Sequence, residues 1–560
     1  MRGVNDGTNS KARGVTWKKW APLLLVVASG VAALLPAAFR GIPSGNDLPH
    51  HYRVAQAFYE SAREGDLYPG WLASANGGYG DLSPRFYPPG LYYLLAAARA
   101  LTGDWYAGSL VCFALLSVVG CLGVYFWARA FLPPHVAAWA GALYAFVPFH
   151  LNDLYNAALF GQYAAAAVLP FAFAFAERVC RGRRPRDVAG LAASFALLIL
   201  THLPLTVVGA LSLATYALSR LRREAVLSTL GRLTLAVALG VAASACYWAT
   251  MLAEKSWVRI ANAPQESWAD YSRNFIFQST VYPETVGVLW VNILAVATFA
   301  MFLPAFALLR GRREVEYRGA AKALALLLAF SFLMATPLSR PVWAALRFLQ
   351  QTQFPWRWLA VTAMAGPVLV AMSVPVWAKK LGEHGKILTA SVVGILLLLV
   401  ALSASFVITD ADYLPRAQFE AKVEAAAAAP SMPDWLPVWA STQPAPMERE
   451  LAVEGRSFSV NSWETARRSF QVAEGAPARA RVRTFYYPYW VATDANGHRL
   501  ETSRDADGAL LVSLPSEAVK VDLSLREPPL SLVSGLVSVA GWCLIVALSV
   551  YDRLRRARAE

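Results

Sequence analysis

A carboxylate followed closely by basic side chains is the first candidate for chemistry in the sequence. The segment Gly45–Arg53 contains Asp47, His50, His51 and Arg53. A carboxylate held at a membrane–water boundary can act as a general base that takes a proton from an attacking hydroxyl. Residues 48–64 have the apolar spacing of an amphipathic helix, so Asp47 also stands where a helix N-cap is expected. The two roles do not exclude each other.

A second carboxylate, Asp153, follows another apolar stretch and is predicted to reach the same membrane face as Asp47. Two carboxylates from different loops at one depth can share a substrate, or a divalent cation such as Mg²⁺ or Mn²⁺. We take Asp47 and Asp153 as the candidate catalytic residues, and the metal question stays open. His202 lies where one apolar stretch turns into the next. It is either a functional group near the apolar region or a hydrogen-bonded interface histidine.

Single arginines outside the membrane are candidates for binding an anionic substrate. Arg347 and Arg357 are predicted to lie outside the membrane, after the predicted span 320–336. Arginine is suited to bidentate phosphate binding. Arg357 stands between two tryptophans, so it can equally anchor the chain in an aromatic belt. Asp81 and Arg85 lie in a glycine- and proline-rich loop, where the alternative is a solvated surface. The predicted substrate-binding residues are His50, His51, Arg53, Asp81, Arg85, His202, Arg347 and Arg357.

The composition indicates the class of protein that must position these residues. Of the 560 residues, 56% are apolar and only 16% are charged, against about 25% charged in an average soluble domain. This excludes a soluble globular enzyme and a disordered protein, and predicts a polytopic α-helical membrane protein. Stretches of about 20 apolar residues predict twelve spans: 20–38, 105–128, 136–150, 157–177, 188–203, 204–219, 227–252, 286–309, 320–336, 356–377, 387–408 and 529–550.

The distribution of basic residues predicts the orientation of these spans. About half of the 51 Lys and Arg residues fall at the two chain ends and in short loops that all lie on one side. The positive-inside rule places that side, with both termini, in the cytoplasm. The net charge of +14 is then a topology signal, and nucleic acid is not an expected partner. The apolar piece 88–101 is predicted to stay outside, because a crossing there would reverse the basic loops that follow.

Three regions follow from this topology. Residues 1–409 are predicted to form the transmembrane domain, with a large first external loop over 39–104. Residues 410–525 are polar and contain period-two stretches separated by turn signals, which predicts a small extracytoplasmic β-sandwich. Residues 526–560 are predicted to form a last transmembrane helix with a basic cytoplasmic tail.

The order of these motifs resembles the GT-C superfamily of integral membrane glycosyltransferases. Asn46-Asp47 stands where that superfamily carries an essential Asp, Tyr87–Tyr93 looks like its Pro-Pro-Leu interfacial helix, and Asp153 matches its second acidic motif. A narrower resemblance is to bacterial 6-pyruvoyl-tetrahydropterin-synthase-related membrane proteins, which are similar to YfhO-type proteins. It rests on 47–53, 86–91, 152–162, 201–204, 354–358 and 486–490. The chain lacks the His₃ zinc pattern of a pterin synthase, and it has Gln162 where relatives tend to carry an acid.

The resemblance implies a membrane glycosyltransferase of the bacterial cytoplasmic membrane that acts in the cell envelope. It would transfer a sugar from a polyprenyl-phosphate donor to an extracytoplasmic glycan, lipid or protein acceptor. Asp47 would deprotonate the acceptor hydroxyl. Arg357, with Arg347, would stabilise the leaving phosphate. The other predicted binding residues would line the site together with Asp153, and the 410–525 domain would orient the acceptor.

Two other functions remain open at this level. The first is a transporter or flippase for a lipid-linked or anionic solute, because twelve spans with both termini inside is also a common transporter count. Such a protein should contain related halves and broken helices at mid-membrane, and the sequence shows neither. The second is a catalytically inactive cell-envelope assembly protein.

Overall fold

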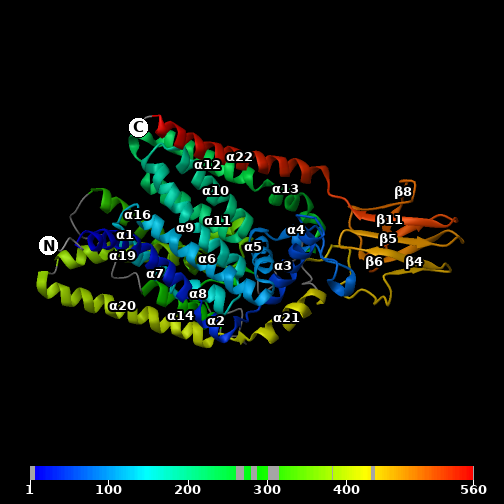
Figure 1. The fold of residues 1–560 in the computed structure, drawn as a ribbon, viewed down its shortest axis with the longest axis horizontal. Helices are drawn as coiled ribbons and strands as arrows, with labels where there is room; N and C mark the ends of the chain where they lie inside the picture. Colours follow the sequence, from blue (N-terminus) through cyan, green and yellow to red (C-terminus); the bar gives the residue numbers. More distant parts are fainter. Residues whose placement is uncertain are drawn as a thin grey trace, which may run out of the picture.

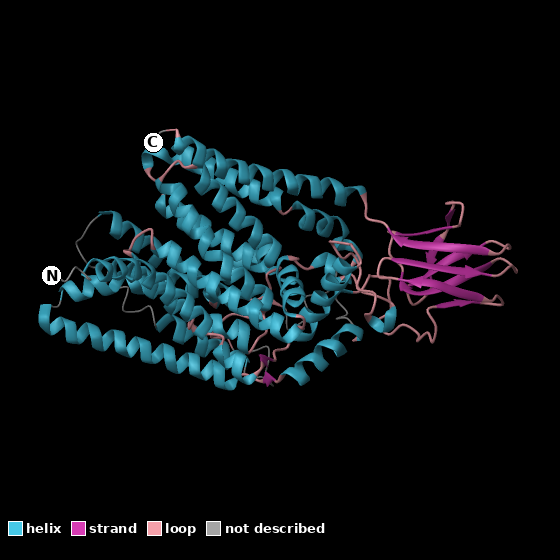
Figure 2. Cartoon of the chain, viewed as in Figure 1, coloured by secondary structure: helices cyan, strands magenta, loops and turns pink. Residues whose placement is uncertain are grey.

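The protein consists of a long helical bundle with a β domain at one end (Figures 1 and 2). The computed structural model describes residues 7–259, 270–278, 287–300, 315–380, 382–429 and 435–558. The two chain ends lie at the end of the bundle opposite the strands (Figure 1).

The helices account for most of the chain. In order, they are α1 (Gly7–Ala32), α2 (Leu35–Arg40), α3 (Leu48–Arg63), α4 (Ser83–Phe86), α5 (Gly90–Thr102), α6 (Trp105–Ala128), α7 (Pro134–Tyr144), α8 (Pro148–Tyr155), α9 (Phe160–Arg181), α10 (Pro185–Thr201), α11 (Leu203–Arg220), α12 (Val226–Ala243), α13 (Ala245–Glu254), α14 (Gly287–Ala300), α16 (Val315–Ala335), α17 (Arg340–Ala345), α18 (Arg347–Gln350), α19 (Leu359–Lys380), α20 (Gly382–Asp410), α21 (Arg416–Ala428) and α22 (Pro529–Ala557).

Eight segments of the described helices are long and apolar enough to cross a membrane. They are Lys19–Arg40, Trp105–Ala128, Phe160–Arg181, Leu203–Arg220, Arg223–Ala243, Arg318–Ala335, Pro355–Val376 and Pro529–Ala557. The prediction of a polytopic helical protein with a β domain before the last helix is therefore confirmed, while the count of twelve spans stays a prediction. Residues 286 and 301–309 of the predicted span 286–309 lie outside the described residues. So do residues 260–269 and 279–285 before that span, and the basic residues Arg310, Arg312 and Arg313 after it.

One predicted span, 136–150, is divided in the structure. Helix α7 ends at Tyr144 and α8 begins at Pro148. A proline has no amide hydrogen to donate and disfavours helical geometry in the residue before it, and Val147 is accordingly extended (φ −64°, ψ 125°). This break gives Asp153 a short helix of its own, α8, directly before α9.

The first external loop is folded rather than open. It contains α3, α4 and α5, and α5 packs against both α3 and α6. With 13 residues, α5 is about 20 Å long, shorter than the ~30 Å hydrocarbon core of a bilayer. The short strand β1 (Ile42–Pro43) pairs with β2 (Tyr413–Leu414), and α21 packs on α3. The chain that leads into the β domain is thereby bound to the first loop.

The β domain contains two antiparallel sheets. One has the order β3 (Leu451–Val453), β6 (Ala478–Phe485), β10 (Ala509–Leu514), β9 (Thr502–Arg504), and the other has the order β4 (Phe458–Trp463), β5 (Arg467–Val472), β11 (Val519–Leu525), β7 (Trp490–Thr493), β8 (Arg499–Leu500). Alternate side chains of both sheets enter one core, among them Val482, Leu510, Phe470 and Val521. All of these strands lie within the predicted domain, whose bounds stay a prediction. From β11 the chain passes into α22, which runs back along the bundle (Figure 1).

Candidate active site

Arg357 is the residue on which the predicted site converges. It lies in the short 3₁₀ helix η8 (Pro355–Trp358) at the start of α19, and its side chain is buried. Nη1 donates to the carbonyl oxygen of Thr352 at 2.6 Å, whereas Nε has no hydrogen-bond partner among the described residues. The guanidinium interacts electrostatically with groups from four separate segments of the chain: Asp47, Tyr87, Asp153 and His202.

Asp47 occupies the N-cap position of α3 but does not use its carboxylate as a cap. Its backbone carbonyl accepts the amide of His51, and the structure shows no capping hydrogen bond from the side chain to the described first turn. Burial raises the pKa of Asp47 to about 6, and the positive charge of Arg357 limits that rise. The carboxylate is therefore largely ionised at neutral pH and more basic than an ordinary Asp, as a general base should be.

Asp153 has a different environment on α8, where its side chain is fully buried. Oδ1 accepts a hydrogen bond of 2.9 Å from Nε2 of Gln162, and Oδ2 has no partner among the described residues. Burial raises the pKa of Asp153 to about 8, against the opposing effects of Gln162 and Arg357. This carboxyl group is thus mostly neutral at pH 7. Two carboxyl groups whose pKa values differ in this way suit separate acid and base roles.

Three of the predicted histidines lie in the same region. The His50 ring is 4.3 Å from the Tyr87 ring, and Nδ1 of His51 lies 3.1 Å from the hydroxyl of Tyr92. Burial lowers the pKa of both histidines, that of His51 to about 4. His202 caps α11, with Nδ1 accepting the amide of Leu205 at 3.2 Å. His202 therefore makes a hydrogen bond of the kind expected of an interface histidine. It also interacts electrostatically with Arg357.

The surroundings of Gly161 show how close two of the histidines lie to the start of α9. A Cβ atom at this position would lie 3.4 Å from Cδ2 of His202 and 4.0 Å from Cε1 of His51. The two rings therefore flank the first turn of α9, which also carries Gln162.

Five unpaired buried polar atoms belong to residues of this region. They are Nδ1 and Nε2 of His50, Oδ2 of Asp153, Oε1 of Gln162 and Nε of Arg357, none of which has a hydrogen-bond partner in the part of the chain that the structure describes. Buried polar groups in proteins are nearly always paired. Both donors and acceptors are left over here, so the group matches a site for a polar ligand that can accept from Arg357 and donate to Gln162.

Arg53 and Asp81 lie close enough to the site to act electrostatically on its residues, Arg53 on His50 and Asp81 on Tyr87. Both are buried and interact electrostatically with each other. Arg53 Nε donates to the carbonyl oxygen of Ala426 in α21 at 3.0 Å, and Oδ1 of Asp81 accepts the amide of Ser83 at 2.5 Å. Both predicted binding residues therefore belong to the charged surroundings of the site.

The structure does not bring Arg85 and Arg347 to the site. Arg347 is exposed on α18. Arg85 is buried in an ion cluster with Glu254 of α13, at 2.6 Å, and Glu527 before α22, at 2.5 Å. The hydroxyl of Tyr487 in the β domain donates to Glu254 at 2.6 Å. Arg85 thus connects the first loop, α13, the β domain and the last helix.

Sequence reasoning missed several residues of the site. Tyr87 and Tyr92 were noted only as part of an interfacial helix motif, and Gln162 only as a departure from relatives. Trp435 packs its ring 4.8 Å from Tyr87 and contributes a hydrogen bond to it. The sequence offers one local indication of a role in the site: Gln162 lies nine residues after Asp153.

Comparisons with solved structures give low overall similarity to several proteins, including the following three. An oligosaccharyltransferase from Archaeoglobus fulgidus in the apo form aligns with a TM-score of 0.38 and 15% identity over 74% of this chain and 56% of its own. ArnT from Cupriavidus metallidurans bound to undecaprenyl phosphate gives 0.44 and 15% over 73% and 77%. The arabinofuranosyltransferase AftD from Mycobacteria (mutant R1389S) gives 0.44 and 17% over 71% and 28%. The chain thus spans about half the length of the first of these relatives.

Comparison with protein families gives a direct assignment. No curated protein sequence matches the chain. The sequence model of the family described as "6-pyruvoyl-tetrahydropterin synthase related domain; membrane protein" matches residues 84–411. This range includes more than half of the chain and contains Asp153, His202 and Arg357. The chain therefore belongs to the family of 6-pyruvoyl-tetrahydropterin-synthase-related membrane proteins.

Proposed function

We propose that the protein is a membrane glycosyltransferase of the GT-C type, which transfers a sugar from a polyprenyl-phosphate donor to an extracytoplasmic acceptor. The observation that carries the proposal is the electrostatic interaction between Asp47 and Arg357. A carboxylate that its helix does not use as a cap lies in the field of a buried arginine whose Nε has no partner among the described residues. One group can accept a proton while the other stabilises an anionic leaving group.

The proposed reaction uses these two groups in one displacement. Asp47 takes the proton of an acceptor hydroxyl as the hydroxyl oxygen attacks the anomeric carbon of the donor. The bond from that carbon to the phosphate oxygen breaks, and its electron pair leaves with the polyprenyl phosphate. Arg357 stabilises the negative charge that develops on this phosphate. In this buried site the attraction is stronger than it would be in water.

Asp153 has a separate role in the proposal. As a neutral carboxyl group fixed through Oδ1 by Gln162, it donates a hydrogen bond to the donor sugar or its phosphate. Oε1 of Gln162, which has no partner among the described residues, accepts from a sugar hydroxyl. Asp47 and Asp153 are also the carboxylates that would contact Mg²⁺ or Mn²⁺. Among the described residues, no group of three or more His, Cys, Asp or Glu side chains could hold a metal ion.

The direct test measures the fate of both the sugar and the polyprenyl phosphate of the donor. Purified protein is incubated in liposomes with polyprenyl-phosphate sugars that are radiolabelled in the sugar, and with extracted envelope glycans or lipids as acceptors. The expected result is label in the acceptor together with free polyprenyl phosphate. Movement of intact donor between leaflets without cleavage would instead identify a flippase. Binding without cleavage or movement would identify an inactive assembly protein.

The pH dependence of transfer is expected to be bell-shaped. Asp47 must be ionised, so kcat/KM should rise with pH through about 6, where burial places the pKa of this residue. Asp153 must be protonated, so kcat/KM should fall above about 8, the pKa that burial gives it. In Asp153→Asn the side chain still donates but cannot ionise, so the alkaline fall should disappear while the acid limb remains. An unchanged alkaline limb would contradict the assignment of Asp153.

The two external arginines are expected to differ in their effect on donor binding. Arg357→Lys replaces a planar fork by a point charge and loses a charge-assisted hydrogen bond of about 1.5–3 kcal/mol. The KM for donor should therefore rise about tenfold or more. Arg347→Lys is the matched control, because Arg347 is exposed, and it should change KM less than about twofold. Initial rates at varied donor concentration measure both, and equal effects would remove the phosphate role of Arg357.

A further inference from the structure

An apolar groove lies between α14 and α20, which contact each other along one side of the bundle (Figure 1). Its volume is about 480 Å³. Ile293 and Val296 of α14 form one wall, Leu399 of α20 belongs to the other, and Phe277 also lines the groove. These four side chains are each at least 40% exposed. The groove is therefore open to whatever surrounds the bundle, and its apolar walls suit a hydrocarbon chain.

The groove lies at the depth of one membrane leaflet. Helices α14 and α20 belong to two of the predicted spans, 286–309 and 387–408, and α20 ends at Asp410, from which the chain continues through β2 and α21 to the β domain. Ser403 and Leu399 line the groove seven and eleven residues before that end, which corresponds to about 10–17 Å along the helix axis. Since the hydrocarbon core of a bilayer is about 30 Å thick, this is the depth of acyl chains in the leaflet that faces the β domain.

Arg340, at the start of α17, lies beside the groove. Its Nη2 donates to Oε1 of Gln278 at 3.0 Å, and Gln278 directly follows Phe277, which lines the groove. Arg340 is exposed, and its neighbours Leu338 and Val342 are 80% and 43% exposed. An exposed arginine among exposed apolar side chains is typical of the membrane interface, where its guanidinium reaches the headgroups.

The backbone at Phe277 holds the groove and the arginine together. Phe277 has a φ of 62°, a left-handed conformation that is rare for a bulky residue. Its amide donates to Oδ1 of Asn292 on α14 at 2.6 Å, and its ring lies 6.2 Å from the Phe332 ring of α16. This conformation keeps the Phe277 ring at the groove while the next side chain, that of Gln278, binds Arg340.

We propose that the groove and Arg340 together form a binding site for an anionic phospholipid, with the lipid phosphate at Arg340 and one acyl chain between α14 and α20. Arginine is suited to phosphate oxygens, and basic side chains beside clefts between membrane helices bind anionic lipid headgroups. An apolar groove alone would accept any lipid chain, so Arg340 supplies the selectivity for a negatively charged headgroup.

This lipid is distinct from the donor of the proposed transfer reaction. That reaction places the donor phosphate at Arg357, and the groups that act electrostatically on Arg357 are Asp47, Asp153, Tyr87 and His202. Arg340 instead binds Gln278. The lipid site therefore does not depend on the proposed function, and it would exist in a transferase, a flippase or an inactive protein alike.

The test measures lipid binding without donor sugar or acceptor. The full chain in detergent is stripped of lipid and titrated with dioleoyl phosphatidylglycerol, dioleoyl phosphatidylcholine and undecaprenyl phosphate, and native mass spectrometry counts the bound lipids. We expect phosphatidylglycerol to bind at least about tenfold more tightly than phosphatidylcholine, which corresponds to 1.4 kcal/mol. Equal binding of the two phospholipids would overturn the role of the headgroup charge. Displacement of phosphatidylglycerol by an equal amount of undecaprenyl phosphate would overturn the assignment to a phospholipid.

Matched variants locate the bound lipid. Arg340→Ala should weaken phosphatidylglycerol binding at least about fivefold, whereas Arg347→Ala, at an exposed arginine of the next helix, should leave it unchanged. Val296→Trp should fill the groove and weaken binding similarly, and Val546→Trp on α22 is its control, because the two valines are 54% and 58% exposed. Melting curves of all variants verify folding. Unchanged binding in Arg340→Ala would overturn the headgroup contact, and unchanged binding in Val296→Trp would overturn the groove as the site of the acyl chain.

Discussion

Asp47→Asn is expected to lower the rate of sugar transfer about a thousandfold while the protein remains folded in the membrane. The loss follows from removal of the general base, whose contribution is typically 10²–10⁴-fold. The fold should survive for two reasons. The Asp47 side chain makes no capping hydrogen bond with the described first turn of α3, and Asn is as good an N-cap as Asp. Transfer rates and melting temperatures of detergent-purified protein measure the two effects.

Asp104→Asn is the matched control for this substitution. Asp104 lies in the same external loop and does cap a helix, because its side chain accepts the amide of Ala107 at 2.7 Å. It also pairs with Arg416 at 2.9 Å. Transfer in Asp104→Asn should stay within about twofold of the parent. Full activity of Asp47→Asn would rule out Asp47 as the base, and an unfolded Asp47→Asn protein would contradict the geometry of its cap.

The parts of the site that could be predicted are those that membrane topology brings together. Asp47, Asp153 and Arg357 each follow or precede an apolar stretch at the same predicted membrane face. Since helix ends on one face share one depth, their proximity follows from the spans themselves. The alternating strands of the β domain could be predicted for the same reason, because a period of two is visible within one short segment.

The roles of the other arginines could not be predicted, because an external arginine has the same sequence signature in three different environments. Arg85 was assigned to substrate, but its partners Glu254 and Glu527 lie 169 and 442 residues away. No local pattern encodes a contact at that separation. Arg347, like Arg357, stands among aromatic and apolar residues, yet Arg357 is buried and Arg347 is exposed. The division of 136–150 was visible as Pro148, but its consequence for Asp153 depends on packing.

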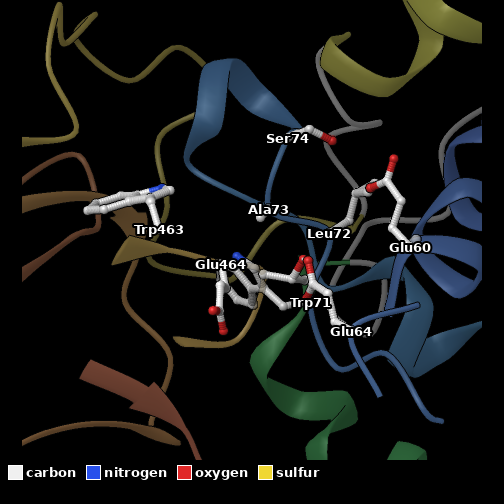
Figure 3. Close-up of a pocket in the computed structure, with 10 residues that line it drawn as sticks. Glu60, Glu64, Trp71, Leu72, Ala73, Ser74, Trp463 and Glu464 are labelled. Carbon is white, nitrogen blue, oxygen red and sulfur yellow. The ribbon is translucent and has the colours of Figure 1, made fainter. Parts of the chain in front are cut away.

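A surface cavity shows the same limit. It is lined by Glu60 of α3, by Trp71 in the loop after α3 and by Trp463 at the end of β4, more than 380 residues later (Figure 3). No local pattern in the sequence encodes a contact at that separation.

The second large effect is expected at Arg85, where substitution by Ala should destabilise the whole protein. Its side chain is 3% exposed and that of Glu254 is 1% exposed. Removing one partner of a buried pair leaves an uncompensated charge and typically costs about 3–5 kcal/mol. Glu527, which Arg85 binds directly, lies between β11 and α22, and Tyr487 of the β domain joins the cluster through Glu254. The melting temperature should therefore fall by several degrees, as thermal unfolding of detergent-purified protein measures.

The cluster also predicts a graded series. Glu254→Gln should be nearly as damaging as Arg85→Ala, because Glu254 accepts from both Arg85 and Tyr487. Glu527→Gln should cost only about 1 kcal/mol or less, because the Glu527 side chain is 43% exposed and its charge is screened by water. Arg85→Met combined with Glu254→Met should recover part of the loss, since apolar replacement of a whole buried pair is often neutral. Equal losses at Glu254 and Glu527, or no recovery in the double variant, would show that the buried pair does not hold the β domain to the bundle.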